Sequence, residues 1–95
     1  MNNVIWKYPL KPELNRIEMP KNALTLTVQI QGDQPVLWAL VNPEEEQETR
    51  SFLVVTTGEP IEALDPVALR LGYVATFQMD WMVFHVFDTF KFEAA

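Results

Sequence analysis

The segment from Ala23 to Val41 constrains the fold more than any other part of the chain. Over Leu24–Gln31 an apolar residue alternates with Thr or Gln at every step, which is the period of a β-strand with one buried and one solvated face. Over Val36–Val41 every residue is apolar, and so short a run between Pro35 and Pro43 is typical of a strand covered on both faces. The Gly-Asp-Gln-Pro tetrapeptide between the two arms has turn chemistry. The pattern therefore predicts a β-hairpin whose second arm is central in its sheet.

Further strand patterns precede and follow this hairpin. The segment Thr49–Thr57 is expected to return antiparallel beside Val36–Val41, and Asp80 with Trp81 forms a tight link between the last two strands. Asp88 interrupts the apolar face of the final strand, so either a β-bulge near it or a change of sheet there is expected. The predicted strands outside the hairpin are Val4–Tyr8, a short strand through Leu14, Ile17 and Met19 that ends at Pro20, Thr49–Thr57, Tyr73–Met79 and Met82–Phe92.

Prolines and one glycine set the remaining limits on the fold. Pro9 and Pro12 bracket the exit of the first strand, which favours a place at a sheet edge. The only helical pattern begins with Asp65 as N-cap and Pro66 at the first helical position, and Gly72 closes it. Ninety-five residues make a single domain, residues 1–95. The fold class predicted is all-β and mainly antiparallel, a small β-sandwich or partly open barrel with at most one short helix.

Composition and charge limit the classes of partner and the cellular compartment that we expect for this protein. The net charge of −6 and the pI near 4.5 argue against nucleic-acid binding and against docking on anionic lipid. They permit a basic partner, although solubility alone is the simpler interpretation of the charge. No apolar run approaches the roughly 18 residues of a membrane helix, and the N-terminus lacks the pattern of a signal peptide. Without cysteine there is neither disulfide nor thiol chemistry. We expect a cytoplasmic protein that does not bind membranes.

Residues able to carry catalysis are sparse. His85 is the only histidine, whereas zinc takes three or four nitrogen or sulfur ligands. As a general base it would need a partner carboxylate, and the sequence does not place Asp80 or Asp88 beside it. Ser51, the only serine, lacks the glycines of a nucleophile elbow, and the acidic run 44–48 does not have the spacing of a calcium loop. We therefore expect no enzyme, no cofactor and no metal ion, and a structural or incidental role is the simpler interpretation of the histidine.

Aromatic residues are the stronger candidates for a binding surface. Trp and Tyr combine a large apolar area with a polar group. Trp38 lies within an apolar run and is expected in the core, whereas Trp81 at a turn is expected to be exposed. Arg50 could bind a phosphate or a partner carboxylate, or it could pair with Glu48 on the same strand face. The candidate binding residues are Trp81, Arg50, Tyr73, His85 and Phe87.

A series of short sequence blocks occurs along most of the chain. The blocks are Ile5-Trp6-Lys7-Tyr8, Met19-Pro20, Leu37-Trp38-Ala39-Leu40-Val41 with Pro43, Glu48-Thr49-Arg50 with Phe52, Thr57-Gly58 with Pro60, Thr76-Phe77-Gln78 and His85-Val86-Phe87. In this order they resemble a family of small uncharacterised proteins of phages and prophages, described as a domain of unknown function. Members tend to have a Gly-rich link where this chain has Asp80-Trp81-Met82. The resemblance implies a phage accessory protein in a bacterial cytoplasm, and it implies no site residue.

Two classes of binding function remain open. In the first, the protein engages a host protein, such as a defence or regulatory factor, through an acidic and aromatic surface. In the second, it binds a small ligand, for example a nucleotide signal, at an oligomer interface. An Arg and aromatic cluster around a pocket would favour the ligand, and a flat aromatic patch rimmed by carboxylates would favour the protein.

Self-association is also expected. The run Met82–Phe87 carries little charge, and at a sheet edge it would pair with a second copy, most simply as a homodimer. The rival arrangement is a monomer in which Val4–Tyr8 covers that edge.

Overall fold

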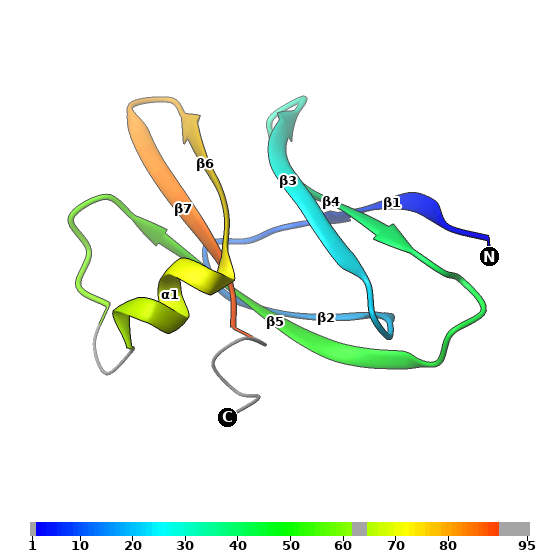
Figure 1. The fold of residues 1–95 in the computed structure, drawn as a ribbon. Coiled ribbons are helices and arrows are strands. Elements are labelled where there is room, and N and C mark those ends of the chain that lie inside the picture. The colour runs from blue at the N-terminus through cyan, green and yellow to red at the C-terminus, as the bar shows by residue number, and fades with distance from the viewer. Residues whose placement is uncertain (1, 62–64, 90–95) are drawn as a thin grey trace.

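The computed structural model describes residues 2–61 and 65–89, which form two antiparallel sheets and one short helix (Figure 1). One sheet has the order β1-β4-β3 and the other the order β2-β5-β7-β6. This arrangement confirms the prediction of a small all-β sandwich, and the sheets do not close into a barrel. The elements are β1 (Val4–Pro9), β2 (Glu13–Pro20), β3 (Leu24–Gln31), β4 (Gln34–Val41), β5 (Gln47–Thr56), α1 (Pro66–Gly72), β6 (Tyr73–Met79) and β7 (Met82–Asp88).

The hairpin that dominates the sequence is present as β3 and β4. Gly32 in the turn has a φ of +63°, which a residue without a Cβ adopts at little cost. Strand β4 lies between β1 and β3, so the second arm is central, as predicted. Strand β1 is at the edge, where Pro9 removes no hydrogen bond from the sheet interior.

The apolar face predicted along the first arm is only partly buried. The register between β3 and β4 shifts between Thr25 and Thr27, and Val28 beyond the shift is buried. Leu24 and Leu26 are instead 59% and 43% exposed. A bulge changes which side chains face the core, so the prediction was wrong for the first half of this strand.

Two further predictions about strand placement were wrong. Strand β5 pairs with β2 and β7 and not with β4, because β1 and β3 already occupy both edges of β4. Of the two alternatives expected at Asp88, the bulge is absent from the described residues of β7: Asp88 ends this strand with its side chain buried, and the register shift lies in β6, between Tyr73 and Ala75. Residues 90–92 of the predicted last strand lie outside the described residues.

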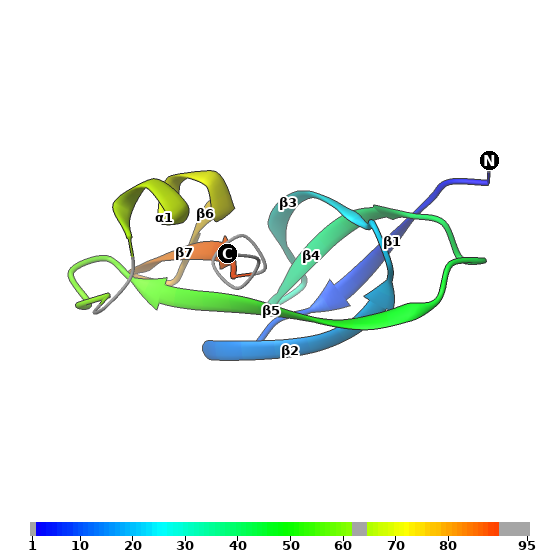
Figure 2. The ribbon, with the colours of Figure 1, turned by 60° about the horizontal axis from the view of Figure 1, so that its bottom comes forward.

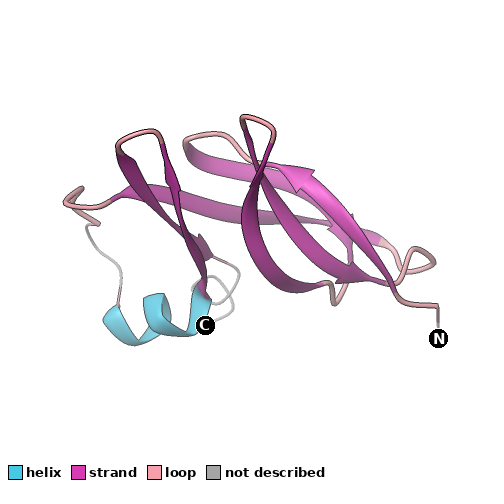
Figure 3. Ribbon diagram, turned by 90° about the horizontal axis from the view of Figure 1, so that it is seen from above, coloured by secondary structure: helices cyan, strands magenta, loops and turns pink. Residues whose placement is uncertain are grey.

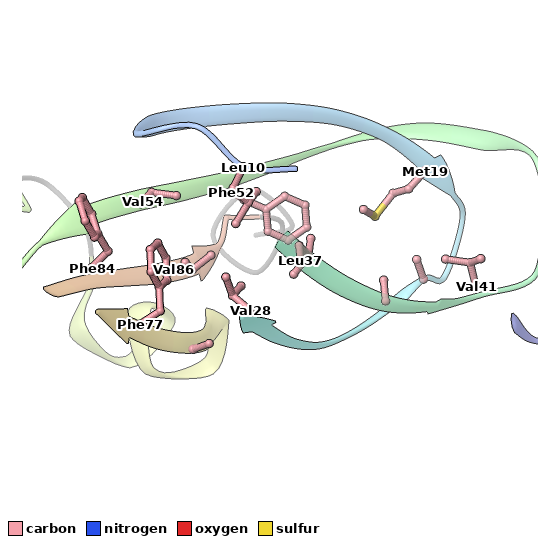
Figure 4. Packing of buried hydrophobic residues seen from close by; sticks show 13 residues of the cluster. Leu10, Met19, Val28, Leu37, Val41, Phe52, Val54, Phe77, Phe84 and Val86 are labelled. Carbon is pink, nitrogen blue, oxygen red and sulfur yellow. The ribbon is translucent and has the colours of Figure 1, made fainter. Parts of the chain in front are cut away.

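The core lies between the two sheets. In Figure 2, β2 and β5 run beneath β1 and β4. Leu37 of β4 and Phe52 of β5 are both fully buried and meet across this layer (Figure 4). Trp38, which was expected in the core, is half-buried on the opposite face of β4, because residues alternate along a strand and Leu37 and Ala39 take the inner positions.

The short helix forms where the sequence predicts it. Asp65 is the N-cap, and its carboxylate accepts a hydrogen bond from the Val67 backbone nitrogen at 3.0 Å. Pro66 occupies the start of α1, and the helix contacts β7. No helix in the described part of the chain is long and apolar enough to cross a membrane.

Candidate functional site

Three of the predicted site residues lie together on the outer face of the four-stranded sheet. The register of β6 and β7 pairs Tyr73 with Phe87 and Thr76 with His85, and paired residues on antiparallel strands project to the same face. Val86, between His85 and Phe87, points into the core. The alternation of β7 therefore places the imidazole and the phenyl ring away from the core.

An edge-to-face aromatic pair forms one part of this surface. The ring centroids of Tyr73 and Phe87 lie 5.9 Å apart at an interplanar angle of 65°, a geometry that aromatic quadrupoles favour. Tyr73 is half exposed to solvent, and Phe87 is half-buried. The exposed tyrosine ring is thus held by a second ring.

A line of hydrogen bonds crosses the same surface. The Tyr73 hydroxyl lies 2.7 Å from Thr76 Oγ1, which lies 3.0 Å from His85 Nδ1. The other ring nitrogen, Nε2, lies 2.7 Å from Thr57 Oγ1, and this hydroxyl reaches the Val83 carbonyl at 3.5 Å.

The hydrogens of these groups can be assigned consistently. With a neutral imidazole protonated at Nε2, Tyr73 donates to Thr76 and Thr76 donates to Nδ1. His85 then donates from Nε2 to Thr57, whose hydroxyl donates to the Val83 carbonyl. In this tautomer every hydrogen along the line has an acceptor.

Both nitrogens of His85 are occupied by threonine hydroxyls in this arrangement. Before a ring nitrogen of His85 could bind a metal ion or accept a proton from another group, one of those hydroxyls would have to move away from it. None of the groups in the line is a carboxylate such as the one that orients the histidine of a hydrolytic triad. Among residues 2–61 and 65–89 no three His, Cys, Asp or Glu side chains are grouped as metal ligands. The line of hydrogen bonds therefore orients the side chains of Tyr73, Thr76 and His85 on this surface.

Trp81 stands at the end of this surface, in the turn between β6 and β7. Its side chain is 85% exposed, as the sequence predicted. It lines a hollow of about 270 Å³ together with Thr56, Thr57, Met82 and Val83. Thr57 belongs to both the hollow and the line of hydrogen bonds. We call the combined surface of Thr57, Tyr73, Thr76, Trp81, His85 and Phe87 the His85 face.

Two acidic residues are neighbours of residues that line the hollow, one through hydrogen bonds and one in the sequence. Glu59 accepts hydrogen bonds from the backbone nitrogen and the hydroxyl of Thr56, at 3.0 and 3.1 Å. Asp80 is exposed beside Trp81 and has a φ of +58°, which the turn imposes. Glu59 is thus bonded to a residue that lines the hollow, and Asp80 directly precedes one.

Arg50 is not part of this surface. Its side chain is buried on the inner face of β5, where Nη2 lies 2.5 Å from Asp88 Oδ2. Nη1 donates to the Ala23 carbonyl at 2.8 Å, and the guanidinium carbon lies 5.8 Å from the centroid of the Phe52 ring. From the sequence, Glu48 was the local alternative as a partner of Arg50. In the structure Arg50 pairs instead with Asp88, which lies 38 residues away in the sequence. Arg50 thus connects β5 to β7 and to the turn between β2 and β3, and its side chain is buried away from the His85 face.

A separate apolar cleft is lined by residues of both sheets, among them Gln34 of β4 and Met79 of β6. The β3–β4 and β6–β7 hairpins project from the same side of the molecule (Figure 3). The volume of the cleft is about 280 Å³. Phe77 and Phe84 line it and stack at 5.2 Å with an interplanar angle of 18°. None of the sequence-predicted site residues lines this cleft.

Two members of the His85 face were missed by the sequence reasoning. A two-residue link at Asp80 and Trp81 sets the hairpin register and places Thr76 opposite His85. Counting back from this link would therefore have predicted that Thr76 neighbours His85. Thr57 is 28 residues from His85, and no local pattern connects the two.

The chain belongs to the family described as domain of unknown function DUF7352, whose model matches residues 1–94. The resemblance to a family of unknown function is thereby confirmed. Searches of the curated proteins and of the solved structures found no match.

Proposed function

We propose that this protein is a non-catalytic binding module that engages another protein through the His85 face. The observation that carries the proposal is the exposed Tyr73 ring, which packs on Phe87 and is hydrogen-bonded through Thr76 to His85. We propose further that the chain is phage-encoded and that the partner is a host protein, such as a defence or regulatory factor. The resemblance of the sequence blocks supports this context.

Preorganised aromatic side chains support the choice of a protein partner. Tyr and Trp are enriched among the residues that dominate binding energy, and a side chain that is already ordered loses less entropy on binding. Tyr73 is held by one ring contact and one hydrogen bond. Trp81 adds a second, more exposed ring at the end of the face.

The charge around the surface favours a basic partner. Glu59 is hydrogen-bonded to Thr56 of the hollow, Asp80 precedes Trp81 in the turn, and the whole chain carries a net charge of −6. Lysine or arginine side chains around the contact area of a partner would therefore be attracted at long range. The apolar contact would then come from the two aromatic rings.

The hollow beside Trp81 supports a small-ligand function as the second candidate. Its lining combines an indole ring with the hydroxyls of Thr56 and Thr57, which could stack and orient a flat ring. A nucleotide would also require a cation for its phosphate. Arg50, the candidate cation, is instead buried against Asp88, which makes the protein partner the better-supported choice.

Affinity capture with matched variants tests the proposal. The test variant is Tyr73→Ala with Trp81→Ala, and the control is Ile5→Ala with Leu24→Ala, which removes exposed apolar side chains from the other sheet. We expect one host protein to be captured by the wild type and the control but lost from the test variant. Titration calorimetry with the purified partner should show a loss of at least about 30-fold, the effect of removing a hot spot.

Other results of the capture experiment would contradict the proposal or support the ligand function. Equal affinity of the wild type and the test variant would overturn the proposal, as would a loss confined to the control. A small molecule that copurifies with the wild type and is absent from the test variant would establish the ligand function instead. Thermal melting of both variants checks that the fold is kept, which is expected because all four replaced side chains are exposed.

A further inference from the structure

The four edge strands of the sandwich differ in how they are protected. Unpaired strand edges attract other strands unless bulges, charges or covering segments block them. Strands β3 and β6 both contain a register shift and contact one another. Strand β2 carries charges at Glu13, Arg16 and Glu18. Among the described strands, β1 is the edge that combines an unbroken register with mostly apolar side chains.

The side chains of β1 leave its edge open. Val4, Ile5 and Trp6 are 39%, 57% and 41% exposed. The single charge on the strand is Lys7, and its ammonium donates to Gln31 Oε1 at 2.6 Å. Because Gln31 lies on β3, beyond β4, this hydrogen bond directs the lysine across its own sheet and away from the free edge.

The backbone groups on this edge can be identified from the register. Leu10 donates to the Pro35 carbonyl at 3.0 Å, which continues the register of β1 with β4. Hydrogen-bonded and non-hydrogen-bonded pairs alternate along antiparallel strands. The N–H and C=O groups of Ile5 and Lys7 therefore point outward, and Pro9, which has no N–H, falls on the next outward position.

We propose that β1 pairs antiparallel with β1 of a second copy across a twofold axis, which joins two three-stranded sheets into one. In the proposed register Ile5 lies opposite Lys7 of the second copy, so each such pair exchanges two backbone hydrogen bonds. Trp6 then lies opposite Trp6 of the second copy, as the non-hydrogen-bonded pair on the axis. A register shifted toward Pro9 would set Lys7 against Lys7, which like charges disfavour.

This interface replaces the one expected from the sequence. Strand β7, which contains Met82–Phe87, lies between β5 and β6 and has no free edge. The rival expectation, that Val4–Tyr8 covers that strand, is also wrong, since this segment pairs with β4. Pairing through β1 uses the other sheet and leaves the His85 face accessible, so it does not depend on the proposed function.

Sedimentation equilibrium over a concentration series tests the pairing in the native sequence. We expect the wild type to rise from the monomer mass of 11.0 kDa toward twice that value. Lys7→Pro removes an outward N–H and should weaken dimerisation at least about tenfold, whereas Lys7→Ala keeps that N–H and should dimerise like the wild type. A wild type that stays monomeric, or a Lys7→Pro variant that dimerises like the wild type, would overturn the pairing.

Disulfide crosslinking tests the register, because the chain has no cysteine of its own. Trp6→Cys should form a disulfide-linked dimer under mild oxidation, since the two thiols would face each other across the axis. Val4→Cys is the matched control on the same strand and face, and it should remain monomeric because it lies opposite Tyr8 of the second copy. Crosslinking of Val4→Cys in preference to Trp6→Cys, or of both equally, would refute the proposed register.

Discussion

The buried ion pair between Arg50 and Asp88 should make a large contribution to the integrity of the fold. Their side chains are only 7% and 5% exposed, and their closest atoms are 2.5 Å apart. Removing one partner of a buried pair leaves an uncompensated charge and costs about 3–5 kcal/mol. We therefore expect Asp88→Ala to lower the free energy of unfolding by about 3–5 kcal/mol in urea denaturation.

Thermal unfolding should report the same loss. A 95-residue domain has an unfolding entropy of about 0.2 kcal/mol/K near its melting temperature, so the melting temperature should fall by about 15–25 °C. The double replacement of Arg50→Met with Asp88→Leu removes both charges and fills the space with apolar atoms. It should cost less than either single replacement, because no buried charge is left behind.

An exposed ion pair in the same chain provides the control. Lys21 and Glu46 lie 3.1 Å apart with side chains that are 49% and 82% exposed. Glu46→Ala should cost less than about 1 kcal/mol, since solvent screens such pairs. If Asp88→Ala costs no more than Glu46→Ala, the inference that the buried pair of Arg50 and Asp88 stabilises the fold is refuted.

Three further predictions concern other parts of the fold. Tyr8→Phe should be neutral or stabilising by up to about 1 kcal/mol at neutral pH, because the buried hydroxyl has no hydrogen-bond partner. Burial also raises the pKa of Tyr8, so the wild type should lose stability as the pH rises above 10. Urea titrations at several pH values should show that Tyr8→Phe lacks this loss. Phe52→Ala should cost about 3–5 kcal/mol in urea denaturation, against less than about 0.5 kcal/mol for Glu45→Ala in an exposed loop; similar values would contradict the assignment of inside and outside. Asp65→Ala should destabilise α1 by about 1 kcal/mol through loss of the N-cap, and unchanged amide hydrogen exchange in the helix would contradict this.

Local pattern was sufficient to predict most of the secondary structure. The alternation before Gly32 and the apolar run after it identified β3 and β4, and the Asp65-Pro66 pair identified the start of α1. Each of these signals lies within a few neighbouring residues. The buried apolar face of β3 failed at the point where a bulge shifts the register, because no residue type in that segment marks the bulge.

Placement of strands in the two sheets could not be predicted in the same way. Strand β5 follows β4 in the chain, but it leaves for the other sheet because both edges of β4 are occupied. That choice depends on β1, more than thirty residues earlier in the sequence. The same non-local topology makes β7 an inner strand and removes the edge on which the original dimer prediction depended.

The candidate site was predictable to the extent that it is local to the β6–β7 hairpin. His85 and Phe87 share a face by alternation, and Trp81 is exposed because it lies in the turn. Strict alternation would place Tyr73 on the inner face with Ala75 and Phe77, and the register shift between Tyr73 and Ala75 turns it outward. Arg50 could not be assigned, because its partner Asp88 lies 38 residues away. The sequence pattern of the strand does not determine whether this arginine faces the core or the solvent. That depends on whether a carboxylate faces it in the core.

A nuclear magnetic resonance titration of the isotope-labelled protein with the captured partner tests the role of the His85 face most directly. We expect the indole N–H of Trp81 and the backbone amides of β6 and β7 to shift on binding, while the amides of β1 and β4 stay in place. Shifts centred on the three-stranded sheet, or on Leu10 and Phe77 in the cleft between the sheets, would contradict the assignment of the His85 face as the binding surface.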